Sequence, residues 1–226
     1  MENDIVDITP ENRTDMHTAL HQLLRRFNLD WGLMRAVMLA TGAVISGSAA
    51  LAVLQIGEFV PQDLDIYVTS KNLAVVLVFL QEQGYKVQIP MSTADNTQNY
   101  TETSVMLTLQ NDTGEKIDLI ATLEGHVIHA ITRFHSTCVM NFIAYYGIVC
   151  LYPQWTMRKA ALVRAGVSDY QAIYKYRGRG FNMLHRSAEL PDYEPSHMCG
   201  KHQCCPKAKR ELHDHITFVV VYLPRR

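Results

Sequence analysis

The spacing of apolar positions along the chain predicts a mixture of helices and strands. Between residues 17 and 27, leucines and a phenylalanine recur every three to four residues, as on one face of an amphipathic helix. Elsewhere the apolar runs are short, rich in β-branched residues and bounded by turn-forming residues, which is typical of strands. Strands are predicted over residues 44–46, 63–68, 85–89, 104–110, 116–120, 147–152 and 217–223.

Capping residues mark where helices begin. A first helix over residues 10–27 starts at Pro10, whose missing N–H is tolerated in the first turn. A second helix, capped by Asp30, runs to about Ala40. Further helices are predicted over residues 49–54, 71–83 and 126–146, and a helical annex over residues 154–188.

Asp63 and Asp65 lie one residue apart in a predicted strand. Side chains alternate across a strand, so both carboxylates point to one face, while Leu64 and Ile66 point to the other, into a core. Neighbouring carboxylates repel each other unless a positive charge lies between them, and a divalent metal ion is the usual solution. The same pattern also occurs on solvated edge strands, where charges discourage aggregation.

A third carboxylate, Asp118, is the lone charge in an apolar run that follows a hairpin turn at residues 111–114. Three aspartates on neighbouring strands can hold two Mg²⁺ ions for in-line attack on a phosphate. Gly47 and Ser48 stand between a strand and a helix, where backbone N–H groups and the Ser48 hydroxyl can cradle phosphates. A Gly-Ser pair at this place is also a common turn and N-cap.

The order of these residues resembles a known family. Gly47-Ser48, a helix, Asp63-x-Asp65 and then Asp118 on a later strand are similar to the motifs of the nucleotidyltransferase superfamily of the DNA polymerase β type. Poly(A) polymerases and CCA-adding enzymes are members. The resemblance covers roughly residues 36–125 and implies an α+β fold with a mixed sheet flanked by helices. The loop around residues 57–61 is longer than the family usually shows.

The resemblance implies Mg²⁺-dependent transfer of a nucleoside monophosphate from a triphosphate, with ATP the expected substrate, to an acceptor hydroxyl. The acceptor would be RNA, a protein or a small molecule. Asp63 and Asp65 would bind both Mg²⁺ ions, and Asp118 would complete the site and act on the attacking group. Gly47 and Ser48 would hold the triphosphate. The alternative is a catalytically silent binding module of this fold, including a zinc-stapled one that binds nucleic acid.

Four further residues are candidates for contacting the nucleotide. Ser136 and Thr137 follow the third carboxylate strand, where the resembled family often places such contacts. Arg177 and Arg179 lie in a basic annex rich in tyrosine, and this combination stacks on bases and neutralises phosphates. Two alternatives stay open. The hydroxyls can bond to their own helix carbonyls, and basic runs are often solvated faces.

Cysteine and histidine residues are concentrated near the C-terminus. Cys199, His202, Cys204 and Cys205 suit a structural Zn²⁺ site, although their spacing matches no standard zinc finger. An irregular surface segment with free thiols is the alternative. These features divide the chain into a nucleotidyltransferase-like core with N-terminal helices over residues 1–153, and the annex with this Cys/His-rich tail over residues 154–226.

Composition and charge limit the remaining choices. The formal net charge is −1, so the chain lacks the general positive field of a tight, non-specific nucleic-acid binder. The acidic start lacks a signal peptide's basic region, which predicts an intracellular protein, cytoplasmic or nuclear. The 22 residues between Arg35 and Glu58 carry no charge and are long enough to span a bilayer. Their glycines, serines and strand–helix pattern favour a buried segment instead, and no membrane partner is expected.

Overall fold

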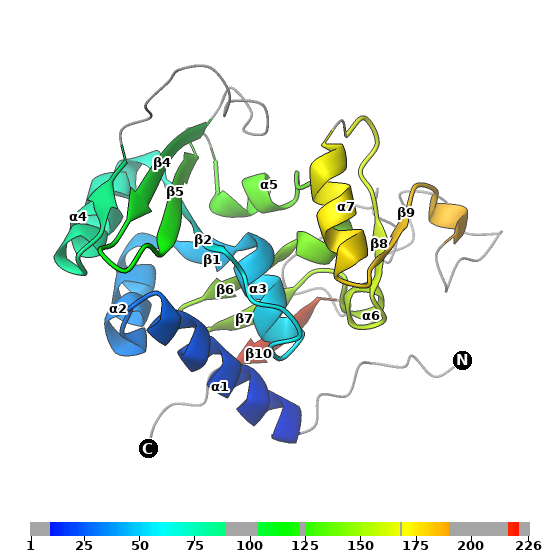
Figure 1. Cartoon of the computed structure of the whole chain (residues 1–226), viewed down its shortest axis with the longest axis horizontal. Helices are drawn as coiled ribbons and strands as arrows, with labels where there is room; N and C mark the ends of the chain where they lie inside the picture. The colour runs from blue at the N-terminus through cyan, green and yellow to red at the C-terminus, as the bar shows by residue number, and fades with distance from the viewer. Residues whose placement is uncertain (1–9, 89–103, 123–124, 168, 190–216, 222–226) are drawn as a thin grey trace.

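A mixed sheet of eight strands forms the centre of the protein in a computed structural model, which describes residues 10–88, 104–122, 125–167, 169–189 and 217–221. Its strands are β1 (Val44–Ser46), β2 (Asp63–Thr69), β3 (Lys86–Val87), β4 (Ser104–Gln110), β5 (Lys116–Thr122), β6 (Asn141–Ala144), β7 (Gly147–Cys150) and β10 (Phe218–Val221). They lie in the order β10-β7-β6-β1-β2-β5-β4-β3 (Figure 1). Among the described strands of this sheet, β2 and β5 are parallel neighbours, and the other neighbouring strands pair antiparallel. The predicted α+β class with a mixed sheet flanked by helices is confirmed.

The helices begin and end close to the predicted positions in the first half of the chain. Asp30 caps the second helix as predicted, because its Oδ1 accepts a hydrogen bond of 2.9 Å from the Leu33 N–H. Gly42, with φ of 70°, ends that helix in the left-handed conformation that favours glycine. The helices are α1 (Pro10–Arg26), α2 (Trp31–Thr41), α3 (Gly47–Leu54), α4 (Leu73–Glu82), α5 (Val127–Ile131), α6 (Pro153–Met157) and α7 (Tyr170–Gly178).

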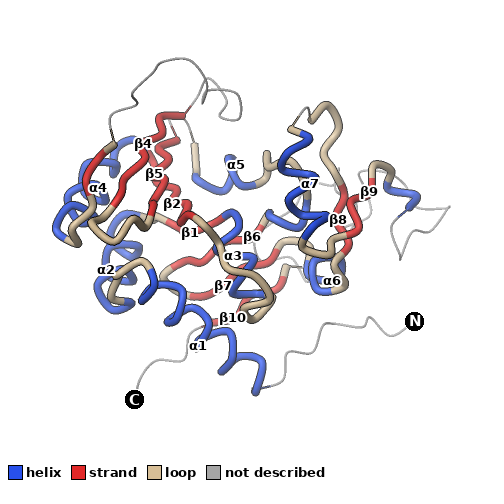
Figure 2. Tube along the Cα trace, viewed as in Figure 1, coloured by secondary structure: helices blue, strands red, loops and turns tan. Residues whose placement is uncertain are grey.

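The two faces of the sheet are buried against different helices, as Figure 2 lets the reader follow. Leu64 and Ile66 of β2 are fully buried in a core shared with α1, α2 and α4, as the alternation predicted. Tyr67 of β2 and Ile120 of β5 lie in a second core with α5 and α6. Because alternate residues of a strand share a face, the predicted site aspartates lie on this second face.

The predicted long helix over residues 126–146 is wrong. Only α5 is helical there; a loop, a short 3-10 turn over Thr137–Val139 and strand β6 follow it. Strand β6 is buried along its whole length between β1 and β7. A short apolar run that is buried on all sides has the same composition in a helix and in a strand, so periodicity does not separate them.

The annex is helical in α6 and α7, as predicted, but it also contains a small parallel sheet of β8 (Ala160–Leu162) and β9 (Asn182–Leu184). Leu51 of α3 shares a core with annex residues such as Tyr176 and Phe181. Strand β10 extends the edge of the main sheet by pairing with β7, which confirms the last predicted strand. The predicted domain boundary at residue 153 stays a prediction.

The uncharged stretch between Arg35 and Glu58 folds as most of α2, then β1 and α3. Among the described residues, no helix is both long enough and apolar enough to cross a membrane. The candidate zinc ligands Cys199, His202, Cys204 and Cys205 lie outside the described residues.

Candidate active site

Three carboxylates lie on one face of two adjacent parallel strands. The pairing of β2 with β5 places Asp65 opposite Asp118 and Asp63 opposite Lys116. All three aspartates are half-buried, while the residues that flank them in the strands are fully buried in the opposite core, namely Leu64, Ile66, Ile117 and Leu119. The structure therefore brings together the carboxylates that the sequence singled out.

Thr108 of β4 orients Asp118 from the other side. Its hydroxyl donates a hydrogen bond of 2.6 Å to Oδ1 of Asp118, and the two residues are directly paired across the hairpin. This contact occupies one carboxylate oxygen and leaves Oδ2 for another partner. Thr108 was not among the predicted site residues, although the hairpin turn, which pairs Gln110 with Lys116, also sets Thr108 opposite Asp118.

Gly47 stands in direct contact with Asp65. Its φ is 64°, and a Cβ atom added there would lie 2.1 Å from Oδ2 of Asp65, well inside van der Waals contact. Only glycine combines this backbone conformation with this close approach. The turn at Gly47 therefore packs directly against the Asp65 carboxylate.

The two serines beside Gly47 have different roles. Ser46 ends β1, and its Oγ donates a hydrogen bond of 2.6 Å to the Asn141 carbonyl, which ties the turn to β6. Ser48 is also buried, but its Oγ has no hydrogen-bond partner among the described residues. A buried hydroxyl without a partner is unfavourable, so Ser48 is the polar group here that a ligand would satisfy.

Burial and neighbouring negative charge raise the pKa values of Asp65 and Asp118. Burial, and after it the charges of Asp63 and Asp118, raise the pKa of Asp65 from 3.8 to about 8, although Lys175 acts in the opposite direction. Burial and the charge of Asp63 also raise the pKa of Asp118, against the Thr108 hydrogen bond and the charge of Lys116. Negative charge at this site is therefore incompletely compensated by the protein.

Helix α7 brings two residues of the annex within electrostatic reach of the carboxylates. Lys175 is exposed and favours the charged form of Asp65. Tyr176 is buried, and burial, with smaller contributions from Asp65 and Asp63, raises its pKa. Sequence reasoning placed neither residue at the aspartate site, because only the packing of the annex on α3 brings them there.

The two arginines of the annex that are predicted to contact the nucleotide have different surroundings. Arg177 is exposed on α7, whereas the Arg179 guanidinium lies 3.9 Å from the centroid of the Phe59 ring and 5.1 Å from that of Tyr176. Phe59 belongs to the long loop between α3 and β2, so this contact packs that loop against the annex. An ion pair between Glu58 and Lys159 has the same effect.

Ser136 and Thr137 lie where the annex meets α3, not in a long helix. Ser136 is buried with its Oγ 3.3 Å from the Cys138 Sγ, and its backbone pairs with Val163. Thr137 Oγ1 accepts a hydrogen bond of 3.0 Å from the Leu162 N–H. Both hydroxyls therefore have partners within the protein, and their contact with a nucleotide stays a prediction.

The donor set suits a hard divalent cation. Carboxylate oxygens are the ligands that Mg²⁺ prefers, and a cation would relieve the mutual repulsion that raises the pKa of Asp65. Within the part of the chain that the structure describes, however, no three acidic, histidine or cysteine side chains converge closely enough to hold a metal ion. Metal binding would thus require the aspartate side chains to turn toward one another.

Comparison with known proteins gives a likeness of overall structure. No protein-family model matches the chain, and no curated protein matches its sequence. A solved CCA-adding enzyme in complex with CTP is similar, with a TM-score of 0.49 and 15% identity over 74% of this chain and 43% of that chain. The Thermotoga maritima CCA-adding enzyme complexed with tRNA gives a TM-score of 0.47 and 14% identity, over 74% and 42% of the two chains.

A third similar structure is a CCA-adding enzyme in complex with ATP, with a TM-score of 0.46 and 14% identity over 73% of this chain and 41% of that chain. The chain thus spans about two fifths of the length of the CCA-adding enzymes it matches.

Proposed function

We propose that the protein is a divalent-metal-dependent nucleotidyltransferase, which moves a nucleoside monophosphate from a nucleoside triphosphate to an acceptor hydroxyl. The observation that carries the proposal is the fit of Gly47 against Asp65. A glycine turn contacts Asp65, one of three carboxylates on adjacent parallel strands, and its buried Ser48 hydroxyl has no partner among the described residues. This arrangement joins a phosphate cradle to a cation site.

Each residue has a distinct part in the proposed reaction. Gly47 and Ser48 bind the triphosphate through backbone N–H groups and the Ser48 hydroxyl. Asp63, Asp65 and Asp118 hold Mg²⁺, which when bound neutralises phosphate charge and lowers the pKa of the attacking hydroxyl. Asp118, with Oδ1 held by Thr108, presents Oδ2 to the acceptor hydroxyl.

Turnover of the four ribonucleoside triphosphates tests this proposal. Pyrophosphate release is measured with and without Mg²⁺ in the wild type and in the Asp63→Asn/Asp65→Asn double variant, with RNA or protein extract as acceptor. Release that needs Mg²⁺ and is lost in the double variant would establish the enzyme and identify its nucleotide, for which ATP is our expectation. Release that is unchanged in the double variant would refute it.

Ser48→Ala is expected to weaken triphosphate binding without destabilising the fold. The hydroxyl has no partner to lose in the described part of the chain, whereas a hydrogen bond to a charged phosphate contributes roughly 1.5–3 kcal/mol, so KM should rise about tenfold or more. The matched control is Ser46→Ala, which removes the bond to Asn141 and should lower stability by about 1 kcal/mol. Steady-state kinetics and urea unfolding of both variants separate the two effects. Equal KM values for wild type and Ser48→Ala would contradict the assigned role.

A catalytically silent module of the same fold is the second candidate function. It is favoured by the finding that no three ligating side chains converge on a metal position among the described residues. Such a module would bind a nucleoside triphosphate without releasing pyrophosphate, even when acceptors are added. Equilibrium binding of a fluorescent ATP analogue, run beside the turnover assay, distinguishes it from the enzyme.

A structural Zn²⁺ held by Cys199, His202, Cys204 and Cys205 stays a prediction from the sequence. Purified protein is expected to contain about one zinc per chain by elemental analysis, because four such ligands complete a tetrahedral site. The quadruple replacement of these residues by serine or alanine should lower the zinc content to background. A wild-type protein purified without zinc, which also fails to take it up, would contradict this prediction.

A further inference from the structure

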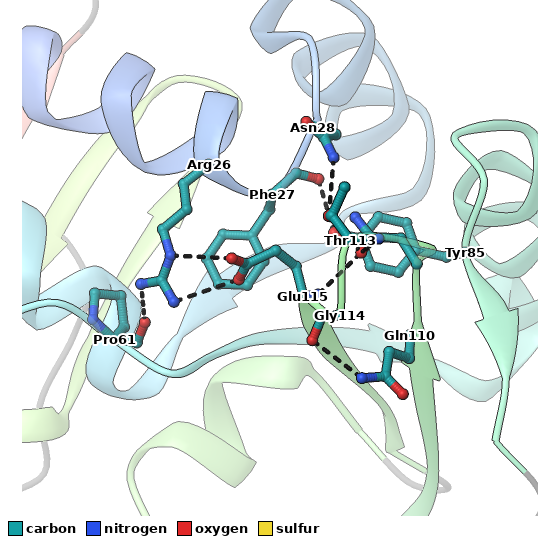
Figure 3. A network of polar contacts seen from close by, with 10 residues as sticks. Arg26, Phe27, Asn28, Pro61, Tyr85, Gln110, Thr113, Gly114 and Glu115 are labelled. Carbon is teal, nitrogen blue, oxygen red and sulfur yellow. Dashed lines mark hydrogen bonds and ion pairs between the residues drawn. The ribbon is translucent and has the colours of Figure 1, made fainter.

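Arg26, at the C-terminal end of α1, bonds to both chain segments that lead into the carboxylate strands (Figure 3). Its Nε lies 3.4 Å from Oε1 of Glu115 and its Nη2 lies 3.3 Å from Oε2, which is a two-point contact. Its Nη1 donates to the carbonyl of Pro61. The Arg26 and Glu115 side chains are only 33% and 22% exposed, so water screens their ion pair less than one at the open surface.

The contacts of Arg26 lie just before the first residues of β2 and β5. Pro61 lies two residues before Asp63, the first residue of β2, and Glu115 directly precedes the first residue of β5. Asp63 therefore stands at a strand end, where pairing is most easily lost. The strands are parallel, so no tight turn joins them and fixes their separation. One guanidinium bonded to both segments supplies that constraint.

We propose that Arg26 is a positioning residue, which fixes the starts of β2 and β5 so that Asp63 stays beside Asp65 and Asp118. The inference rests on the proposed function of those carboxylates. Arginine suits this task because its planar fork can bond a carboxylate at two points and still donate to a third group. A lysine, with one ammonium group, cannot reproduce all three contacts.

Arg26→Gln is expected to weaken cation binding at the carboxylates. The probe is Mn²⁺ alone, with free Mn²⁺ followed by electron paramagnetic resonance in the full chain without nucleotide. We expect an affinity about tenfold lower than in the wild type, as for other residues that orient metal ligands indirectly. Pyrophosphate release at limiting Mg²⁺ should fall by a similar factor and recover in part at high Mg²⁺. Glu115→Gln should have a smaller effect, because the bond to Pro61 remains.

Tyr85→Phe is the matched control. The Tyr85 hydroxyl donates a buried hydrogen bond of 2.7 Å to the carbonyl of Phe27, the residue that follows Arg26. Its hydrogen bond is not to Pro61 or Glu115, which precede the carboxylate strands. The control should lower the melting temperature and leave Mn²⁺ affinity unchanged. If Arg26→Gln behaves in the same way, Arg26 is merely structural and the inference is overturned.

Mn²⁺ binding by the Asp65→Asn and Arg26→Gln variants distinguishes a failure of the Arg26 role from a failure of the proposed function. Loss of Mn²⁺ binding in Asp65→Asn, with wild-type affinity in Arg26→Gln, would refute only the role of Arg26. A wild type that binds no Mn²⁺ and releases no pyrophosphate would refute both. If Arg26→Gln does not fold, Arg26→Lys with Glu115→Gln carries the test, since Arg26→Lys retains the charge but not the fork.

Discussion

Asp65→Asn should abolish nucleotidyl transfer while leaving a folded protein that is more stable than the wild type in the absence of metal. The substitution removes the carboxylate that stands opposite Asp118 and beside Asp63, so the cation site loses its central ligand. We expect pyrophosphate release to fall by about 10³-fold or more, as when a group that stabilises transition-state charge is removed. Steady-state rates at saturating Mg²⁺, compared with those of the wild type, measure this loss.

The stability gain has a defined pH dependence. The folded protein holds the Asp65 proton up to a pKa of about 8, whereas the ordinary pKa is 3.8, so the folded state binds more protons between these values. The contribution of the Asp65 carboxyl group to the free energy of unfolding is fully present below pH 3.8 and is lost as the pH rises toward 8. One pKa unit corresponds to about 1.4 kcal/mol, and partial exposure screens some of the repulsion. Asp65→Asn should therefore raise the free energy of unfolding at pH 8 by roughly 2 kcal/mol.

Urea unfolding at pH 4 and pH 8, with and without Mg²⁺, measures how the stability difference between the variant and the wild type depends on pH and on the cation. Mg²⁺ should stabilise the wild type at pH 8 more than Asp65→Asn, because the variant retains only the repulsion between Asp63 and Asp118 for a cation to relieve. Asp112→Asn is the control, since Asp112 is exposed on the hairpin turn, where it pairs with Lys86. Equal stability of Asp65→Asn and the wild type at pH 8 would show that burial and neighbouring charge do not disfavour the ionised Asp65 as inferred.

Gly47→Ala is expected to inactivate the enzyme by displacing Asp65. The new Cβ would meet Oδ2 of Asp65 at 2.1 Å, so either the carboxylate or the turn before Ser48 must move. A displacement of about 1 Å in a catalytic group costs about 10²-fold in rate. The left-handed backbone at Gly47, with φ of 64°, adds a strain of about 1–2 kcal/mol. Both the rate and the free energy of unfolding should therefore fall.

Gly42→Ala separates the clash from the backbone strain. Gly42 has a nearly identical φ of 70°, but a Cβ added there meets nothing within 4 Å. This variant should lose about the same 1–2 kcal/mol of stability to strain and keep wild-type turnover per folded molecule. Equal activity losses in the two variants would mean that instability, and not displacement of Asp65, inactivates Gly47→Ala.

Much of the candidate site follows from local sequence patterns. The two-residue repeat of a strand places Asp63 and Asp65 on one face whatever the rest of the chain does. The turn at residues 111–114 joins β4 to β5 and puts Asp118 within the second strand of a hairpin. The position of Gly47 and Ser48 at the start of a helix also depends only on neighbouring residues. These features depend on neighbours in the chain, so the sequence by itself determined them.

Other features depend on contacts between distant segments, and only the tertiary structure decided them. The apolar run that forms β6 is a strand because β1 and β7 lie on either side of it. Lys175 reaches the carboxylates because the annex packs on α3, and Arg26 reaches Pro61 and Glu115 because α1 lies across the starts of two strands. Above all, the parallel pairing of β2 with β5 brings Asp65 opposite Asp118, and no turn in the sequence encodes that pairing.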